Sequence, residues 1–129
     1  MRLLLDTHAL LWVRGEPDRL KSDTKRILAD PAFDVFVSVI SLWELLIKSR
    51  VGKLNIDIDV MIAGLAPASK LQLLGITPQH LRALKTLPFY PQHRDPLDHL
   101  IIAQAISEGM TLVTQDRHAV LYSVQVMLP

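Results

Sequence analysis

Short apolar runs that alternate with helix-like patterns constrain the fold of this chain more than any other feature. Five runs suit strands, at residues 2–5, 34–37, 71–76, 111–114 and 124–127. In the first of them Leu3 to Leu5 is continuously apolar, as in a strand that is buried on both faces of a sheet. Since strand–helix alternation favours parallel strands with helices on both faces, the sequence predicts an α/β fold built on a parallel sheet.

Helix-like patterns fill the intervals between these runs. We expect helices at residues 7–13, 18–29, 38–50, 57–69, 78–84, 95–108 and 117–121. Ser38 or Ser41 is expected to cap the third helix. The sixth has the clearest signals, because Asp95 and Pro96 open it and Gly109 ends it.

The composition limits what such a fold can do. A chain of 129 residues is expected to form a single domain, residues 1–129. The formal net charge of +1 means that any attraction to nucleic acid must come from local patches. The absence of cysteine excludes disulfides and thiolate metal sites and suits the cytoplasm, where we expect the protein to reside. No apolar run approaches the ~20 residues of a membrane span, so no membrane contact is expected.

Five acidic residues stand where the predicted elements begin or end. Asp6 and Asp116 follow two strands, Asp95 and Asp98 open the sixth helix, and Glu44 lies in the third. In open parallel sheets the ligand crevice lies at the carboxyl ends of the strands. Acids crowded there repel one another and raise each other's pKa, so a cluster that stays ionised needs a cation. Oxygen ligands select Mg2+ or Mn2+, and the leading hypothesis is a metal-dependent phosphodiester hydrolase.

Each acid also has a purely local explanation. Asp6, Asp95 and Asp116 occupy positions where an aspartate commonly caps a helix. Asp98 lies in a first helical turn, where the helix dipole favours a carboxylate. Glu44 fits a capping box or an ion pair with a lysine one turn later. Convergence on one sheet edge is predicted only by a metal site.

Other polar residues have weaker patterns. The five histidines lack zinc-like pairing, and most are expected at the surface or behind the site. His8, which follows Asp6 by two residues, is the only one expected near the site, where it could contact nucleic acid. Arg94 and Arg117 each adjoin an acid and are candidates for contact with nucleic acid. The sequence has no Walker A loop, no G-x-G-x-x-G and no G-x-S-x-G elbow.

Two aromatic residues, Phe89 and Tyr90, stand in the loop before the sixth helix. Aromatic side chains beside a nucleic-acid site can stack on an unpaired base. Packing within the loop explains them equally well.

Four segments resemble a known family in their order and spacing. They are Leu3–Trp12, Ser38–Glu44, His93–Ala105 and Leu112–Asp116. Together they resemble the PIN-domain family and, within it, the VapC-type toxins of bacterial type II toxin–antitoxin systems. The resemblance covers essentially the whole chain.

This resemblance implies a parallel five-stranded sheet sandwiched between helices. It implies an endoribonuclease that uses Mg2+ or Mn2+ to cleave RNA, is inhibited by a cognate antitoxin protein and forms a homodimer. The family's acidic quartet corresponds to Asp6, Glu44, Asp98 and Asp116. Supporting positions correspond to Thr114, Thr7 and Asp95, the last as a subfamily feature.

Two other functions are compatible with parts of the pattern. An aspartyl-phosphate enzyme would carry Asp-x-Asp after the first strand, whereas this chain has Asp6-Thr7-His8. A non-catalytic module could bind RNA or a protein partner through the same groove. Binding without metal-dependent turnover would distinguish that module from a nuclease.

Overall fold

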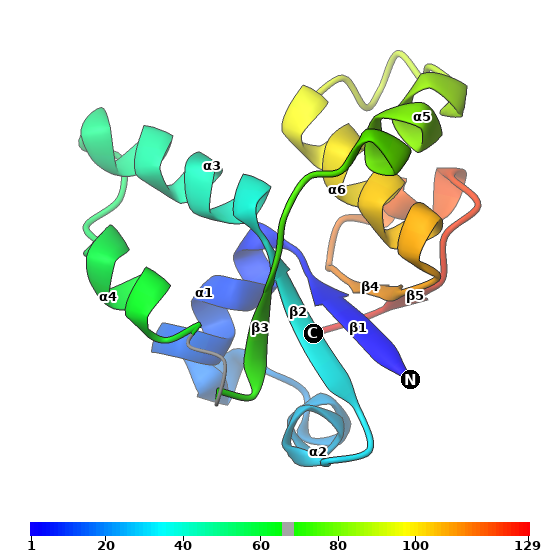
Figure 1. The fold of residues 1–129 in the computed structure, drawn as a ribbon. Helices are drawn as coiled ribbons and strands as arrows, with labels where there is room; N and C mark the ends of the chain where they lie inside the picture. The colour runs from blue at the N-terminus through cyan, green and yellow to red at the C-terminus, as the bar shows by residue number, and fades with distance from the viewer. Residues whose placement is uncertain (66–68) are drawn as a thin grey trace.

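The computed structural model describes residues 1–65 and 69–129 of the chain. Its described residues form one five-stranded sheet in the order β3-β2-β1-β4-β5, with every neighbouring pair parallel (Figure 1). The strands are β1 Arg2–Leu5, β2 Asp34–Ser38, β3 Leu71–Leu74, β4 Thr111–Val113 and β5 Val126–Met127. The predicted α/β class and the parallel five-stranded sheet are therefore confirmed.

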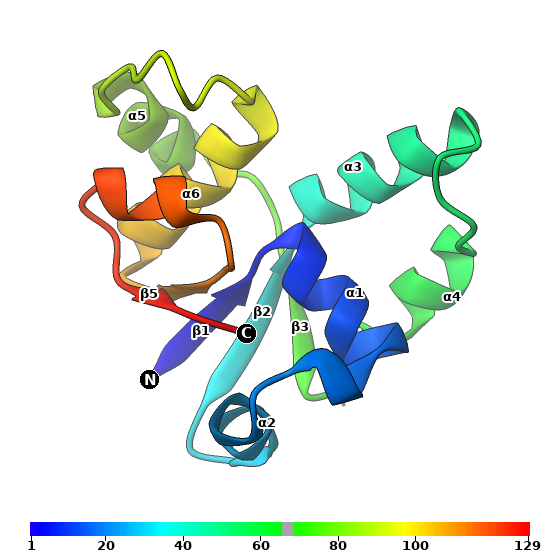
Figure 2. The same cartoon turned by 180° about the vertical axis from the view of Figure 1, so that it is seen from behind.

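Helices cover both faces of this sheet (Figures 1 and 2). The α-helices are α1 Thr7–Gly15, α2 Ser22–Ala29, α3 Val39–Arg50, α4 Ile58–Ala63, α5 Pro78–Thr86 and α6 Pro96–Glu108. Two short 3-10 helices are η1 Pro17–Arg19 and η2 Arg117–Leu121. No helix in these parts of the chain is long and apolar enough to cross a membrane.

The alternation of side chains along β1 divides the core in two. Leu3 and Leu5 pack in one cluster with apolar residues of α1, α2 and α4. Leu4 points to the other face and packs with residues of α6 and η2. All three leucines are completely buried. A strand buried on both faces must be apolar at every position, which is why this run predicted a central strand.

The predicted helix at residues 18–29 is wrong in one respect, because the chain leaves the helical conformation at Leu20 and Lys21. Leu20 is buried, and the amide of Lys21 donates to the carbonyl of Pro129 at 3.0 Å. These long-range contacts separate η1 from α2. A local helical pattern cannot report them.

Other boundaries differ by smaller amounts. The helix predicted at 57–69 ends at Ala63, and residues 66–68 of that prediction lie outside the described residues. Ser38 rather than Ser41 caps α3, since its hydroxyl accepts from the amide of Ile40 at 3.0 Å. The predicted capping box from Ser41 to Glu44 is therefore wrong.

The strand order places the crevice of this fold. From β1 the chain adds β2 and β3 on one side and β4 and β5 on the other. The order therefore reverses between β1 and β4, and ligands of open parallel sheets bind at such a switch point, outside the carboxyl ends of the strands. Asp6 follows β1, and Thr114 to Asp116 follow β4.

Candidate metal centre

Asp6 is held at the end of β1 by hydrogen bonds to both of its carboxylate oxygens. Oδ1 accepts from the amide of Ala9 at 2.7 Å, so Asp6 caps α1 as predicted. Oδ2 accepts from the hydroxyl of Thr114 at the end of β4. Burial raises the pKa of the Asp6 carboxyl, and these two hydrogen bonds oppose that rise. Asp6 therefore caps α1 with one oxygen while the other contacts the end of β4, so the cap does not exclude convergence.

Thr114 connects two of the acids. Its hydroxyl donates to Asp6 and accepts from the amide of Asp116 at 3.0 Å. Asp116 in turn caps η2, where its Oδ1 accepts from the amide of His118 at 2.9 Å. Oδ2 of Asp116 lies 3.3 Å from His93 Nε2. The buried threonine thus links the Asp6 carboxylate to the backbone of Asp116.

Glu44 reaches the same cleft from α3. Its Oε1 accepts from the buried hydroxyl of Thr7 at 3.0 Å, and Thr7 Oγ1 also lies 3.1 Å from Ser41 Oγ. Its Oε2 accepts from Lys48 Nζ at 2.8 Å. The predicted helical pair with a lysine is therefore present, and the carboxylate still lines the cleft.

Asp95 and Asp98 come from the start of α6. Asp95 is exposed and caps the helix, with Oδ1 accepting from the amide of Leu97 at 2.9 Å. Asp98 lies in the first turn, on the same side as Asp95. Burial and the nearby charges of Asp95, Glu44, Asp116 and Asp6 raise the pKa of Asp98 to about 7. Burial is the largest cause of this rise, and the four neighbouring negative charges add to it.

These side chains line one open cleft of about 430 Å³. Its lining includes all five predicted acids and the predicted Thr7, Thr114, His8 and Arg117. Arg94 is the exception. It is exposed, its Nε donates to the carbonyl of Pro91 at 2.9 Å, and it lines a separate apolar hollow beside α6 with Phe89 and Tyr90.

The two aromatic residues of that loop differ in their surroundings. Phe89 is 91% exposed. Tyr90 is half-buried, donates to the carbonyl of Leu121 at 3.0 Å and packs edge-on against Tyr122. Packing within the loop thus accounts for Tyr90 but not for Phe89.

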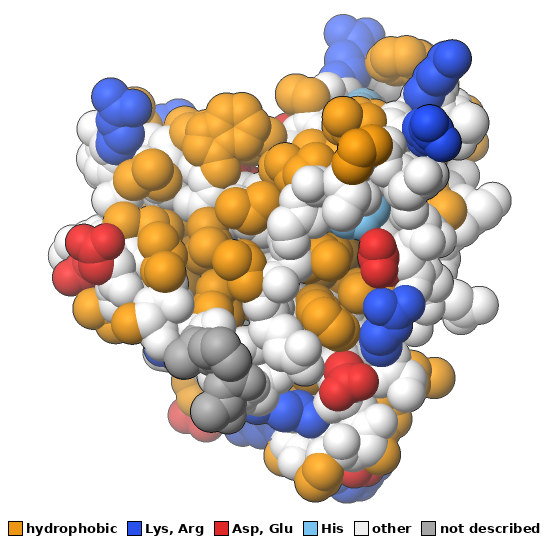
Figure 3. Space-filling model, viewed as in Figure 1, with side chains coloured by type: hydrophobic (Ala, Val, Ile, Leu, Met, Phe, Trp, Pro, Cys, Tyr) orange, Lys and Arg blue, Asp and Glu red, His pale blue; other side chains and the backbone are white. Residues whose placement is uncertain are grey.

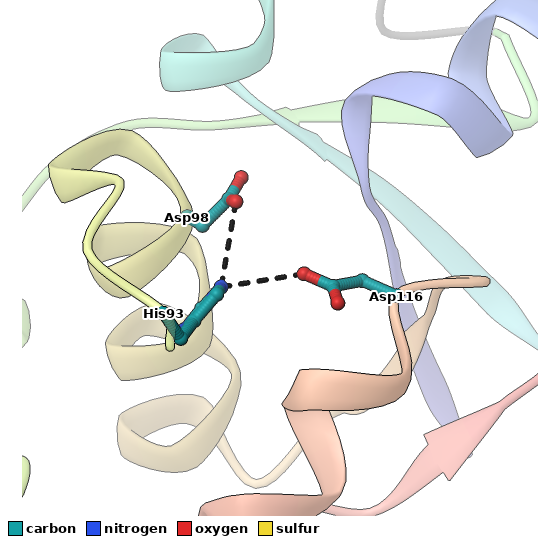
Figure 4. A group of neighbouring side chains, drawn as sticks. All are labelled: His93, Asp98 and Asp116. Atoms are coloured by element: carbon teal, nitrogen blue, oxygen red, sulfur yellow. Dashed lines mark ion pairs between the residues drawn. The ribbon is translucent and has the colours of Figure 1, made fainter. Parts of the chain in front are cut away.

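His93 is the residue that sequence reasoning missed. Its side chain is only 5% exposed, and Nε2 lies 3.5 Å from Asp98 Oδ2 and 3.3 Å from Asp116 Oδ2 (Figure 4). The expectation that His8 is the one histidine near the site is wrong, although His8 does line the cleft. His93 stands two residues before Asp95, and this proximity to a predicted acid is the sequence signal that indicates its position.

The donor set fits a divalent cation. Four carboxylates, those of Asp6, Glu44, Asp98 and Asp116, supply hard oxygen atoms to one cleft. One ligand atom each from His93, Asp98 and Asp116 lies within 4.8 Å of the other two. Ligands at the bond lengths of Mg2+ stand ~3–4 Å apart around the ion, so small side-chain movements would complete such a site.

Comparison with known proteins agrees with this architecture. The family model of the PIN domain matches residues 3–125. The chain is 34% identical over 116 residues to a Mycobacterium tuberculosis protein named Ribonuclease VapC22. The aligned region covers 89% of this chain and 87% of that relative.

Solved structures share the fold. VapBC2 of Rickettsia felis, bound to a DNA fragment from its promoter, superimposes with a TM-score of 0.72 at 18% identity, covering 99% of this chain and 98% of that one. FitAcB of Neisseria gonorrhoeae superimposes with a TM-score of 0.64 at 20% identity. The match covers 97% of this chain and 96% of the FitAcB chain. With the family model matching nearly the whole chain, this protein belongs to the PIN domain family.

Proposed function

We propose that this protein is a metal-dependent endoribonuclease that acts as the toxin of a toxin–antitoxin pair. The observation that carries the proposal is the convergence of Asp6, Glu44, Asp98 and Asp116 on the switch-point cleft of a PIN domain. The relative named a ribonuclease supports the choice of RNA as the substrate. The structural neighbours that are toxin–antitoxin complexes support an antitoxin partner.

The four acids would hold one or two Mg2+ or Mn2+ ions, with Asp95 nearby. When bound, such an ion lowers the pKa of water, orients it for in-line attack on phosphorus and neutralises charge on the leaving oxygen. The residues of the chain would do the rest. Thr114 holds Asp6 toward Asp116, and Thr7 holds Glu44, which would either bind the ion or act instead as a general base.

Basic side chains around the cleft would position the RNA. Lys48 and Arg117 line it together with His8, and all three can face a phosphate. Arg94 stands outside the cleft, so we propose for it a contact with a more distant part of the RNA. The phosphate between the acids and these cations is the one that we expect to be cleaved.

Protein partners would cover an apolar face of the molecule. Exposed apolar side chains gather on α3, α4 and the edge strand β3 (Figure 3). We define this apolar face as Trp43, Leu46, Ile47, Val60, Ile62 and Leu73. Contiguous exposed apolar surface commonly marks a protein interface, which supports a homodimer and an antitoxin complex.

The test is cleavage of a set of structured RNAs by purified, antitoxin-free protein, with Mg2+, with Mn2+ and with EDTA. The proposal expects cleavage with either metal and none with EDTA. Cleavage that continues in EDTA would contradict it. RNA binding without cleavage under every condition would instead identify a non-catalytic binding module.

A further inference from the structure

The imidazole of His93 is buried beside the acids, yet one of its nitrogens makes no hydrogen bond. Nε2 is the one buried side-chain nitrogen or oxygen without a hydrogen bond among the described residues. Its nearest charged atoms are the Oδ2 atoms of Asp98 and Asp116, toward which it points (Figure 4). A buried polar atom without a partner is costly, so its retention calls for an explanation.

The rest of the residue is firmly held. Nδ1 lies 2.8 Å from the hydroxyl of the buried Tyr122. The amide of His93 donates to the carbonyl of Tyr90 at 3.0 Å, and its own carbonyl accepts from His99 Nε2 at 2.7 Å. When the imidazole proton is on Nδ1, that nitrogen can donate to the Tyr122 hydroxyl, and the lone pair of Nε2 then faces the two carboxylates. Metal-binding histidines are oriented in this way, by an oxygen partner on the other ring nitrogen.

The surroundings of His93 differ from those of His80, the other buried histidine of the described residues. Its Nδ1 accepts from the amide of Thr77 at 3.1 Å, and its Nε2 lies 2.9 Å from Glu108 Oε2. Both ring nitrogens are satisfied there. In His93 with its proton on Nδ1, the Nε2 lone pair is repelled by the two carboxylates, and a cation between them would turn this repulsion into attraction.

We infer that Nε2 of His93 is a nitrogen ligand of the divalent cation that Asp98 and Asp116 bind. The inference rests on the metal site of the proposed function and specifies its chemistry. An imidazole nitrogen beside the carboxylates favours first-row transition ions over Mg2+, which prefers oxygen ligands alone. The protein should therefore bind Mn2+ more tightly than Mg2+, with His93 as the source of the difference.

The test uses Mn2+ itself as the probe. Electron spin-echo envelope modulation detects nitrogen nuclei bonded to the ion, without any need for activity. We expect 14N modulation in the wild-type protein that changes to a 15N pattern after growth on 15N-labelled histidine. His93→Gln should lose the signal. His8→Gln and His118→Gln, which alter the histidines that line the cleft, should keep it.

Calorimetric titration supplies a second measurement. His93→Gln should raise the Kd for Mn2+ by roughly 10- to 100-fold, a loss typical even of partners outside the first ligand shell, and should change the Kd for Mg2+ far less. If His93→Gln does not fold, 15N-histidine labelling of a protein that keeps His93 and carries both His8→Gln and His118→Gln decides the question.

The outcomes separate this inference from the proposed function. Mn2+ binding without any histidine nitrogen coupling would overturn the role of His93 and leave the four-acid site standing. Failure of the wild-type protein to bind either metal would overturn both.

Discussion

Asp98 is the acid of the cleft whose pKa is most clearly raised. Partial burial and four nearby carboxylates hold its pKa at about 7, against an ordinary value of 3.8. A carboxyl with a raised pKa is destabilised in its charged form, so it favours a bound cation near neutral pH.

This shift predicts how stability depends on pH without metal. As the pH rises from 4 toward 7, the unfolded chain releases the Asp98 proton first, so the free energy of unfolding falls across that window. Above pH 7 the contribution of Asp98 lowers the free energy of unfolding no further. Thermal unfolding in EDTA should show this fall for the wild type and a smaller one for Asp98→Asn. Identical pH profiles for the two proteins would contradict the assigned pKa.

Thr114 is the residue that joins the two strand ends. Thr114→Val should destabilise the fold by about 1–2 kcal/mol, because a part-buried carboxylate and an amide both lose a partner. RNA cleavage should fall by roughly 10- to 100-fold, the usual effect of losing a residue that orients a metal ligand. Thr114→Ser keeps the hydroxyl and should retain most of the activity. Equal loss in both variants would refute the hydrogen-bonding role.

At the scale of elements, α6 shows what local sequence can predict. Its start at Asp95 and Pro96 and its end at the left-handed Gly109 depend on neighbouring residues alone, and all were predicted. The break between η1 and α2 was not, because it depends on contacts of Leu20 and Lys21 with distant parts of the chain.

The residues of the site also divide into those that local sequence predicts and those that depend on long-range contacts. The acids that end β1 and begin α6 were identifiable because strand ends and helix starts can be read locally. His93 lies in a loop, and its approach to Asp116 spans 23 residues of sequence that no periodicity connects. Similarly, nothing local to Arg94 indicated that it turns away from the cleft.

The cap of α6 can be separated from the chemistry of the site. Asp95→Ala removes the hydrogen bond to the amide of Leu97 and should cost about 1 kcal/mol, whereas Asp95→Ser preserves a cap and should cost less. Chemical denaturation of the two variants measures the difference. Equal stability of both variants and the wild type would show that the cap is not what Asp95 contributes.

For the whole molecule, the apolar face predicts self-association. Ile62 is 50% exposed on α4, and Val120 is 68% exposed on η2, outside this face. Light scattering of the eluted protein should show a dimer for the wild type and for Val120→Glu, and a monomer for Ile62→Glu, because a charge is costly to bury in an apolar interface. A dimer that survives Ile62→Glu would place the interface elsewhere.

The parallel sheet and its switch point bring the acids together from distant parts of the sequence. We propose that this convergence of acids enables metal-dependent cleavage of RNA. The most direct measurement is the cleavage rate of one RNA substrate by the wild type, by Asp98→Asn and by Asp18→Asn, a control on the exposed Asp18 outside the cleft. Each protein is assayed in Mg2+, in EDTA, and in EDTA followed by excess Mg2+.

We expect cleavage by the wild type and by Asp18→Asn that stops in EDTA and returns with Mg2+. The cleavage rate of Asp98→Asn should be lower by at least roughly 100-fold. Equal cleavage by Asp98→Asn and the wild type would contradict it.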